Sequence, residues 1–299
     1  MTSADRFTYL LTSYHDSDRV VRLVERIRAE VPDARIVIMR SRDSAFLKST
    51  PCEVLITSRR IEWGDDSFLE ALLESMSLLK LADNEWLTVL SEDSYPLRSI
   101  RDYQGELSRS GADCWLEQSI LENPAADVLL GRYLHRAIAI PASRRGPFRA
   151  VLLLTLPKIG ISVDGGRSGT RLFIRALRIR RPFGPSLTPR MGSDWYVMKG
   201  RAVTKVLAAR GTVLERYYRK TFSPSEGFVH TVLLNDNTIH NRPLDNHYRR
   251  FEGSHARMFV LADFQELVDS ESWFTRKILD VHLLDRLDTL VGVSTTSFR

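Results

Sequence analysis

The chain has only two cysteines, Cys52 and Cys114, in 299 residues, which is too few for a disulfide framework. We expect both to be buried thiols. Long apolar runs are also missing: the longest, Ala150 to Leu156, is far shorter than the roughly 20 residues needed to cross a bilayer. We therefore expect a soluble, cytoplasmic protein, with peripheral contact at the inner face of the membrane as a further option.

Several catalytic signatures are absent as well. The sequence has no His and Cys cluster with zinc-ligand spacing, no Walker loop and no Gly-x-Ser-x-Gly nucleophile elbow. A D-x-D triplet at residues 16–18 is of the kind that holds Mn²⁺ or Mg²⁺ in many sugar transferases, but it lies between the first expected strand and the first expected helix. We therefore expect Asp16 or Ser17 to cap that helix, and we predict no metal site.

The composition is that of a globular protein that carries excess positive charge. Hydrophobic residues make up 43% and the net charge is +6, which favours anionic partners such as nucleotide phosphates or anionic lipid. The segment 141–190 contains eleven Lys and Arg residues against one acid, Asp164, and we expect it to hold the protein near an anionic membrane or acceptor. It lacks the interleaved aromatic residues of a nucleic-acid stacking platform, so nucleic acid is not expected as a partner.

The first 117 residues alternate between strand and helix patterns. Expected strands lie at 7–13, 35–39, 53–57, 86–90 and 114–117, and apolar residues recur at helical spacing within 20–27 and 69–76. Further helices are expected at 170–179, 200–209, 225–234, 263–269 and 278–290. The pattern predicts an α/β fold with a Rossmann-like central sheet and helices on both faces.

Short motifs occur in a fixed order along the chain. The first strand runs into His15 within YLLTSYH, and an EWG step at 62–64 precedes a helix. The sequence LSEDSYPLRS follows at 90–99 and GSDWYVMKGRAV at 192–203. The last two motifs are SPSEGFVHTVLL at 223–234 and a segment from Ser254 to Leu279 that contains Arg257 and Lys277.

In this order the motifs resemble the core 2/I-branching β-1,6-N-acetylglucosaminyltransferase family, as in bacterial relatives that have the catalytic domain alone. The resemblance covers about residues 7–279. Members read Leu-Ser-Gly-x-Asp-Tyr-Pro-Leu in the third motif, where this chain has Glu92 for the glycine, Ser94 in the aspartate column, and Asp93 one residue early. Members also read Ser-Pro-Asp-Glu, where this chain has Ser225 for the aspartate and keeps Glu226. Whether Asp93 supplies the missing acid stays open.

The resemblance implies an A-type glycosyltransferase fold and an inverting, metal-independent transfer from a UDP-sugar, GlcNAc or xylose, to a hydroxyl of a glycan or lipid-linked glycan. It implies one catalytic domain, 1–299, with a nucleotide-binding half at 1–120 and an acceptor and diphosphate-binding half at 190–299, joined by 141–190. Glu226 is then the catalytic base. The implied donor-binding residues are His15, Asp93, Arg257 and Lys277, and the implied acceptor-binding residues are Asp194 and Trp195.

Each motif also has a purely structural interpretation. Ser223, Pro224 and Glu226 form the pattern of a helix start closed by a capping box. Trp195 is either a core residue or a platform for a sugar ring. Arg257 is expected to open an apolar strand, MFVLA. The departures from the family pattern keep a second function open, a non-catalytic protein of the same fold that binds sugar nucleotides or anionic surfaces.

Overall fold

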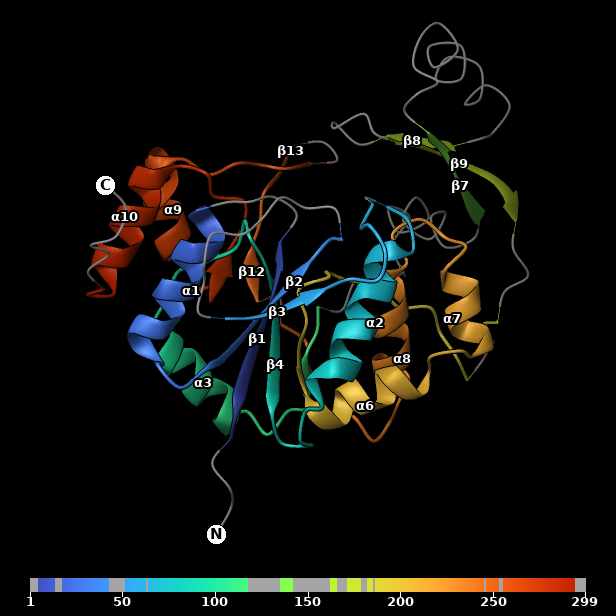
Figure 1. The fold of residues 1–299 in the computed structure, drawn as a ribbon, viewed down its shortest axis with the longest axis horizontal. Coiled ribbons are helices and arrows are strands. Elements are labelled where there is room, and N and C mark those ends of the chain that lie inside the picture. Colours follow the sequence, from blue (N-terminus) through green and yellow to red (C-terminus); the bar gives the residue numbers. More distant parts are fainter. Residues whose placement is uncertain are drawn as a thin grey trace, which may run out of the picture.

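The central feature of the fold is a seven-stranded, mostly parallel sheet (Figure 1). The computed structural model describes residues 5–13, 18–42, 52–62, 64–117, 135–141, 162–165, 171–178, 182–184, 186–244, 246–252 and 255–293. The strand order is β11-β6-β10-β4-β1-β2-β3. The strand bounds are β1 Phe7–Ser13, β2 Arg35–Arg40, β3 Glu53–Ile56, β4 Trp86–Ser91, β6 Cys114–Trp115, β10 Val197–Lys199 and β11 Asn241–Arg242.

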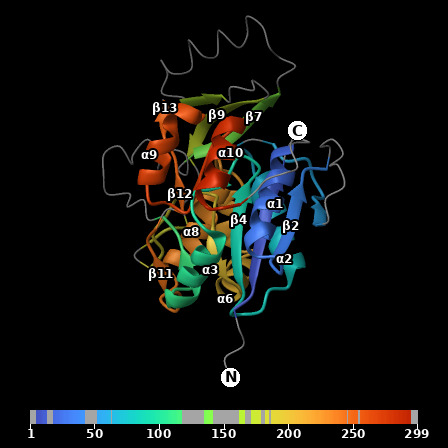
Figure 2. The same cartoon turned by 90° about the vertical axis from the view of Figure 1, so that its left-hand side faces the viewer.

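Helices cover both faces of this sheet, as the sequence predicts. One face carries α1 (Asp18–Glu30), α3 (Ile100–Arg109), α9 (Phe264–Asp269) and α10 (Val281–Leu290), and the other carries α2 (Ser67–Leu79), α6 (Gly200–Ala208), α7 (Val213–Tyr218) and α8 (Ser225–Leu234) (Figures 1 and 2). Because side chains alternate along a strand, Leu10 joins the core beneath α2 and α8, whereas Tyr9 and Leu11 join the core beneath α1 and α10. The result is a mixed α/β protein, consistent with a Rossmann-like architecture.

Three smaller sheets complete the described structure. β5 (Tyr95–Pro96), β12 (His247–Tyr248) and β15 (Phe274–Thr275) form one, and β13 (Phe251–Glu252) pairs with β14 (His255–Ala256). β7 (His135–Pro141), β8 (Ser162–Gly165) and β9 (Arg171–Arg178) form the third, which lies at the end of the molecule opposite the N-terminus (Figures 1 and 2). No helix among the described residues is both long and apolar enough to cross a bilayer.

The helix expected at 170–179 is wrong, because residues 171–178 form strand β9. This segment pairs along its length with β7 and also with β8, and the partner strands override its helical spacing. The expected strand MFVLA is also wrong: Phe259 makes a single bridge with Ile278, and Leu261–Asp263 form the 3₁₀ helix η3.

Two helix starts differ from their expected positions, and one cysteine is less buried than expected. Pro224 is the N-cap of α8 without any side-chain cap, so the expected capping box is wrong. Helix α10 begins at Val281 rather than 278, because Asp280 caps it by accepting from the backbone N–H groups of His282 and Leu283. Cys114 is buried as expected, but Cys52 is only half-buried.

A buried ionic network fixes α10 to α1. The Asp288 carboxylate, which is 1% exposed, receives Arg22 Nη2 at 2.6 Å, the Tyr95 hydroxyl at 2.5 Å and Arg26 Nε at 3.2 Å. Arg22 also pairs at 2.8 Å with Asp285, whose side chain is 56% exposed. The C-terminal helix is therefore held by one desolvated carboxylate that two arginines share.

We expect Asp288→Asn to lower the free energy of unfolding by about 3 kcal/mol, because it removes the buried carboxylate that two buried guanidinium groups share and leaves each of them only its second partner, Asp285 for Arg22 and Glu30 for Arg26. Urea unfolding followed by circular dichroism measures this. Asp285→Asn is the matched control, since it sits on the same helix and contacts the same arginine from an exposed position, and it should cost less than about 1 kcal/mol. Equal losses in the two variants would contradict the assignment.

Candidate functional site

The chain order of the central sheet creates a switch point between β1 and β4. β1 is parallel to both β2 and β4, so the chain leaves it on one side and returns on the other. Open α/β sheets bind ligands outside the carboxyl ends of their strands at such a point. Here the two strand ends are joined, since the Ser13 hydroxyl donates to Glu92 Oε2 at 3.0 Å and both residues are buried.

Antiparallel strands bring two later motifs to the same edge. β10 runs opposite to β4, with Val197 facing Thr88, so the residues that precede it, Asp194 and Trp195, lie toward the carboxyl end of β4. β15 runs opposite to β5, and the Ile278 N–H donates to the Asp93 carbonyl at 3.4 Å. The expected acceptor residues and Lys277 therefore meet Asp93 at one edge of the sheet.

Asp93 lies in a group of charged side chains at the switch point. It accepts a hydrogen bond from the Arg19 guanidinium, and Lys277 Nζ lies 3.9 Å from its other carboxylate oxygen. Arg19 belongs to the first turn of α1, the helix that follows β1. The group thus combines one carboxylate with two cations and the positive end of a helix, and the cations and the helix end attract phosphate.

The backbones of Arg257 and Lys277 are hydrogen-bonded to each other, but the two side chains have different partners. The Lys277 N–H donates to the Arg257 carbonyl at 3.4 Å. The Arg257 guanidinium pairs with Asp263 at 2.7 Å, whereas Lys277 faces Asp93. The two expected diphosphate-binding residues therefore lie on neighbouring segments, and each forms an ion pair with a different acid.

Glu226 lies in the first turn of α8, where hydrogen bonds fix the backbone. Its carbonyl accepts from the Gly192 N–H at 3.0 Å, and the Tyr196 hydroxyl donates to the Ser225 carbonyl at 2.6 Å. A side chain at position 192 would collide with the His230 ring, so this close approach requires glycine. The GSDWY motif and the SPSE motif are thus joined into one unit.

Asp194 connects the same two motifs through its side chain. It accepts hydrogen bonds from Ser225 and from the Tyr196 hydroxyl, the latter at 3.1 Å. Burial raises the pKa of Asp194 to about 6, although these hydrogen bonds and the nearby Arg276 and Arg249 oppose the increase. Asp194 is therefore a carboxyl group whose ionisation changes near neutral pH, in contact with the helix that carries Glu226.

Trp195 is mainly a core residue. It is 8% exposed, and the Arg276 guanidinium lies over its ring, 4.2 Å from the centroid. On the other side its ring is 6.1 Å from His247, whose Nε2 is 3.2 Å from the Ser94 hydroxyl. Burial and the two nearby arginines hold the pKa of His247 well below its usual range, so this histidine is neutral. The indole ring is therefore covered by Arg276 and has no open face.

Most of the expected site residues are therefore close to one another. Several of their neighbours in the structure were not predicted from the sequence. Arg19, His247, Arg249 and Arg276 were not among the expected residues, although Arg276 directly precedes Lys277 and Arg19 follows the D-x-D triplet. His15 and the first two residues of that triplet lie outside the described residues, as does Trp63.

Within the described residues, no three His, Cys, Asp or Glu side chains are grouped as metal ligands. No model of a known protein family matches the chain, and no curated protein sequence matches it. The candidate site is therefore interpreted from its own geometry and from the motif resemblance.

Proposed function

We propose that the protein is an inverting, metal-independent glycosyltransferase of A-type fold, similar to the core 2/I-branching family. It transfers a sugar from a UDP-sugar, GlcNAc or xylose, to a hydroxyl of a glycan or glycoconjugate. The observation that carries the proposal is the meeting of two groups at the carboxyl edge of the sheet: Arg19, Asp93 and Lys277 at the switch point, and Asp194 with the first turn of α8 beside them.

In the proposed reaction, the Glu226 carboxylate takes the proton of the acceptor hydroxyl as its oxygen attacks the anomeric carbon. The bond from that carbon to the β-phosphate oxygen breaks on the opposite face, and UDP leaves with the electron pair. Attack opposite the leaving group inverts the anomeric configuration. Lys277 and Arg257 stabilise the charge that grows on the diphosphate, and Asp194 orients the acceptor.

Asp93 is the candidate for the acid that the family has one position later in this motif. Although it lies one residue early in the motif, its carboxylate is at the switch point and is held there by Arg19 and Lys277. Ser94, which stands in the family's aspartate column, is buried and its hydroxyl contacts Ser91 at 3.0 Å and His247 at 3.2 Å. We therefore propose that Asp93 acts on the donor side and that Ser94 supports the fold.

A thermal-shift panel tests the proposal at the level of binding. A ligand that binds only the folded state raises the melting midpoint, so UDP and at least one UDP-sugar should do so, while an ADP-sugar should not. Turnover is then measured as UDP release with a panel of glycan acceptors. Binding of a UDP-sugar without turnover across that panel would favour the non-catalytic alternative. If no uridine nucleotide shifts the midpoint, the transferase is rejected and only the binding of anionic surfaces is left.

A further inference from the structure

A patch of exposed apolar side chains lies in the C-terminal part of the chain. Of the eleven large hydrophobic side chains that are exposed in the described residues, six lie between 251 and 281. We call these the apolar surface: Phe251, Met258, Val260, Leu261, Leu279 and Val281. Soluble proteins rarely expose apolar residues in this density unless the surface contacts a partner or a membrane.

Strand geometry explains why these residues are exposed together. Phe259 and Ile278 form a parallel bridge, and both are buried. Because side chains alternate along extended chain, Met258 and Val260 on one segment and Leu279 on the other point away from the core. Leu261 joins them because its N–H donates at 2.8 Å to Asp280, the residue that precedes Val281.

A groove of about 600 Å³ adjoins the apolar surface between η3, α9 and α10. It is lined by Leu261, Phe264, His282, Asp285, Arg286, Thr289 and Leu290. The Arg286 guanidinium lies 4.6 Å from the centre of the Phe264 ring. The groove therefore combines three apolar side chains with polar and charged side chains of α10, and it is separate from the candidate site at the sheet edge.

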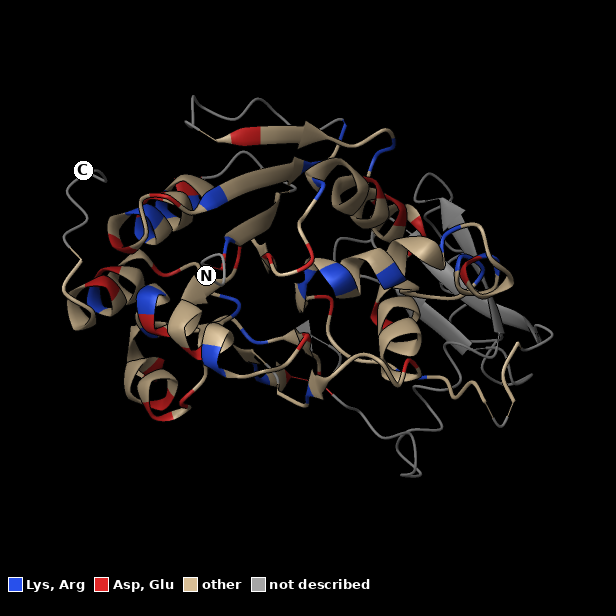
Figure 3. Ribbon diagram, turned by 90° about the horizontal axis from the view of Figure 1, so that it is seen from below, with Lys and Arg blue, Asp and Glu red and all other residues tan. Residues whose placement is uncertain are grey.

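The acids near this surface are compensated within the protein. Asp280 caps α10, Asp285 pairs with the buried Arg22, and Asp263 pairs with Arg257. Glu252, whose side chain is 70% exposed, lies 3.6 Å from the same Arg257 guanidinium. Over the described molecule as a whole, acidic and basic residues are interspersed (Figure 3). The apolar surface is thus accompanied by cations, chiefly Arg286, while the neighbouring carboxylates are matched to protein partners.

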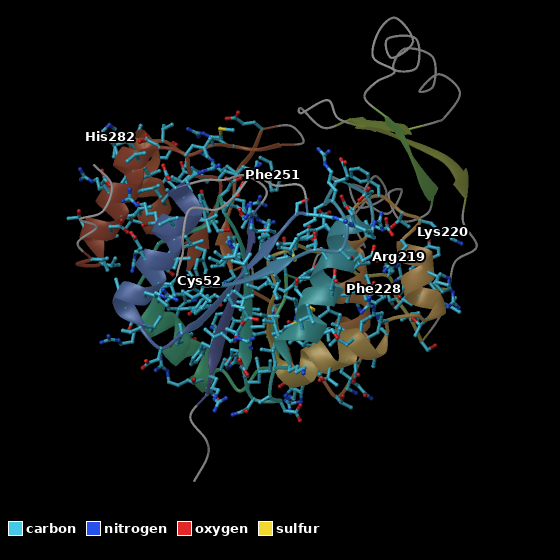
Figure 4. The ribbon with its side chains drawn as sticks, in the orientation of Figure 1. Cys52, Arg219, Lys220, Phe228, Phe251 and His282 are labelled. Carbon is cyan, nitrogen blue, oxygen red and sulfur yellow. The ribbon has the colours of Figure 1, made fainter. Side chains whose placement is uncertain are left out.

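The apolar surface and strand β9, which is part of the basic segment, lie at the same end of the molecule. β13, which carries Phe251, and the β7-β8-β9 sheet are both at the end opposite the N-terminus in two perpendicular views (Figures 1 and 2). Phe251 and His282 are both near this end in Figure 4. The strand β9 contributes Arg171, Arg175 and Arg178 to the basic segment. The carboxyl edge of β1 and β4 faces the same way (Figure 1).

From this arrangement we propose that the apolar surface is a membrane-docking surface that inserts shallowly into an anionic bilayer. Apolar side chains enter the boundary between headgroups and acyl chains, and Arg286 beside them contacts lipid phosphates. This charge pattern favours a bilayer over a protein partner. Docking in this orientation turns the sheet edge toward the lipid, and, if the proposed function holds, it identifies the acceptor as a lipid-linked glycan.

Vesicle co-sedimentation tests the docking without any substrate. The complete protein should sediment with vesicles of phosphatidylcholine and phosphatidylglycerol and much less with phosphatidylcholine alone. The double variant Met258→Asp, Leu279→Asp should lower the partition coefficient by more than about tenfold. Tenfold is about the loss expected if only two methylene groups left the lipid, and the two substitutions remove more apolar surface than that. Leu78→Asp with Val213→Asp is the matched control, since these side chains are 54% and 62% exposed on α2 and α7.

The outcomes separate this proposal from the enzymatic one. Both double variants should keep the parent's melting midpoint and its shift with UDP. Equal sedimentation of the two variants, or self-association through the apolar surface without vesicle binding, would overturn the docking proposal. A different outcome is that sedimentation depends on the apolar surface but no uridine nucleotide shifts the melting midpoint. That outcome would support the docking surface and reject the proposed function.

Discussion

Glu226→Gln should lower turnover by about 10² to 10⁴ fold while the folded protein keeps its affinity for the UDP-sugar. Glutamine has nearly the same shape but accepts no proton at neutral pH, so only the step that needs a base is affected. The measurement is UDP release under saturating donor and acceptor, together with the thermal shift caused by UDP.

The backbone around Glu226 is held by bonds that the substitution does not change. The backbone of the first turn of α8 is fixed by the Gly192 N–H and by the Tyr196 hydroxyl, and neither of these bonds involves the Glu226 carboxylate. Phe228, two residues later, is fully buried and anchors the helix (Figure 4). We therefore expect the melting midpoint of the variant to stay close to that of the parent.

Glu70→Gln is the matched control, because Glu70 is the acid in the first turn of α2 and contacts only exposed or partly exposed arginines. It should turn over like the parent. If Glu226→Gln also turns over normally, the base is another carboxylate. Asp194 is then the first to test, since burial raises its pKa to about 6 and it contacts the same helix, and Asp93 is the second.

The sequence predicted β1 to β4 well because each of these strands is a short apolar run, whereas β6 is two residues shorter than expected and β11, Asn241–Arg242, was not predicted. β1 has the expected bounds, and β2, β3 and β4 differ from expectation by one residue at their ends. Helix α3 was not predicted, although Ile100, Tyr103 and Leu107 are its buried residues and Ser99 caps it. These three residues have helical spacing, but most residues between them are polar, so the apolar stripe was too narrow to be recognised as a helix.

The failures come from tertiary partners that a local pattern does not contain. β9 has helical spacing of apolar residues but pairs with two strands. At α8, the Ser225 side chain bonds to Asp194, which is 31 positions earlier, and Ser223 adopts φ of 47° with its N–H donating to the Gly64 carbonyl. The capping box expected from the local sequence is replaced by these long-range contacts.

The candidate site shows the same contrast between residues that a local motif predicts and residues that depend on tertiary partners. Motif order predicted Asp93, Asp194, Glu226 and Lys277 as site residues, and the antiparallel directions of β10 and β15 explain why such distant residues lie at one edge of the sheet. Arg19 and Arg276 were missed because a single arginine has no signature: its role depends on a carboxylate or an aromatic ring supplied by another segment, Asp93 for the first and Trp195 for the second.

Activity should survive excess EDTA, while Lys277→Ala should lower turnover by about 10² to 10³ fold. As the bond to the anomeric carbon breaks, negative charge grows on the β-phosphate, and a fixed positive group must be close to it. At the switch point Lys277 is a cation on a rigid segment, and its position beside Asp93 fixes where its charge lies. UDP release with and without EDTA, for parent and variant, measures both effects.

Arg257 provides the second part of this prediction. Its guanidinium offers a planar fork to phosphate oxygens and is held by Asp263 at 2.7 Å, so Arg257→Lys should be impaired as well as Arg257→Ala. Arg250→Ala is the control, since Arg250 is half exposed and pairs with Glu266 at 2.7 Å in a surface ion pair of little energetic weight. If EDTA abolishes turnover and Mn²⁺ restores it, while Lys277→Ala behaves like the parent, a metal ion rather than these cations stabilises the leaving group.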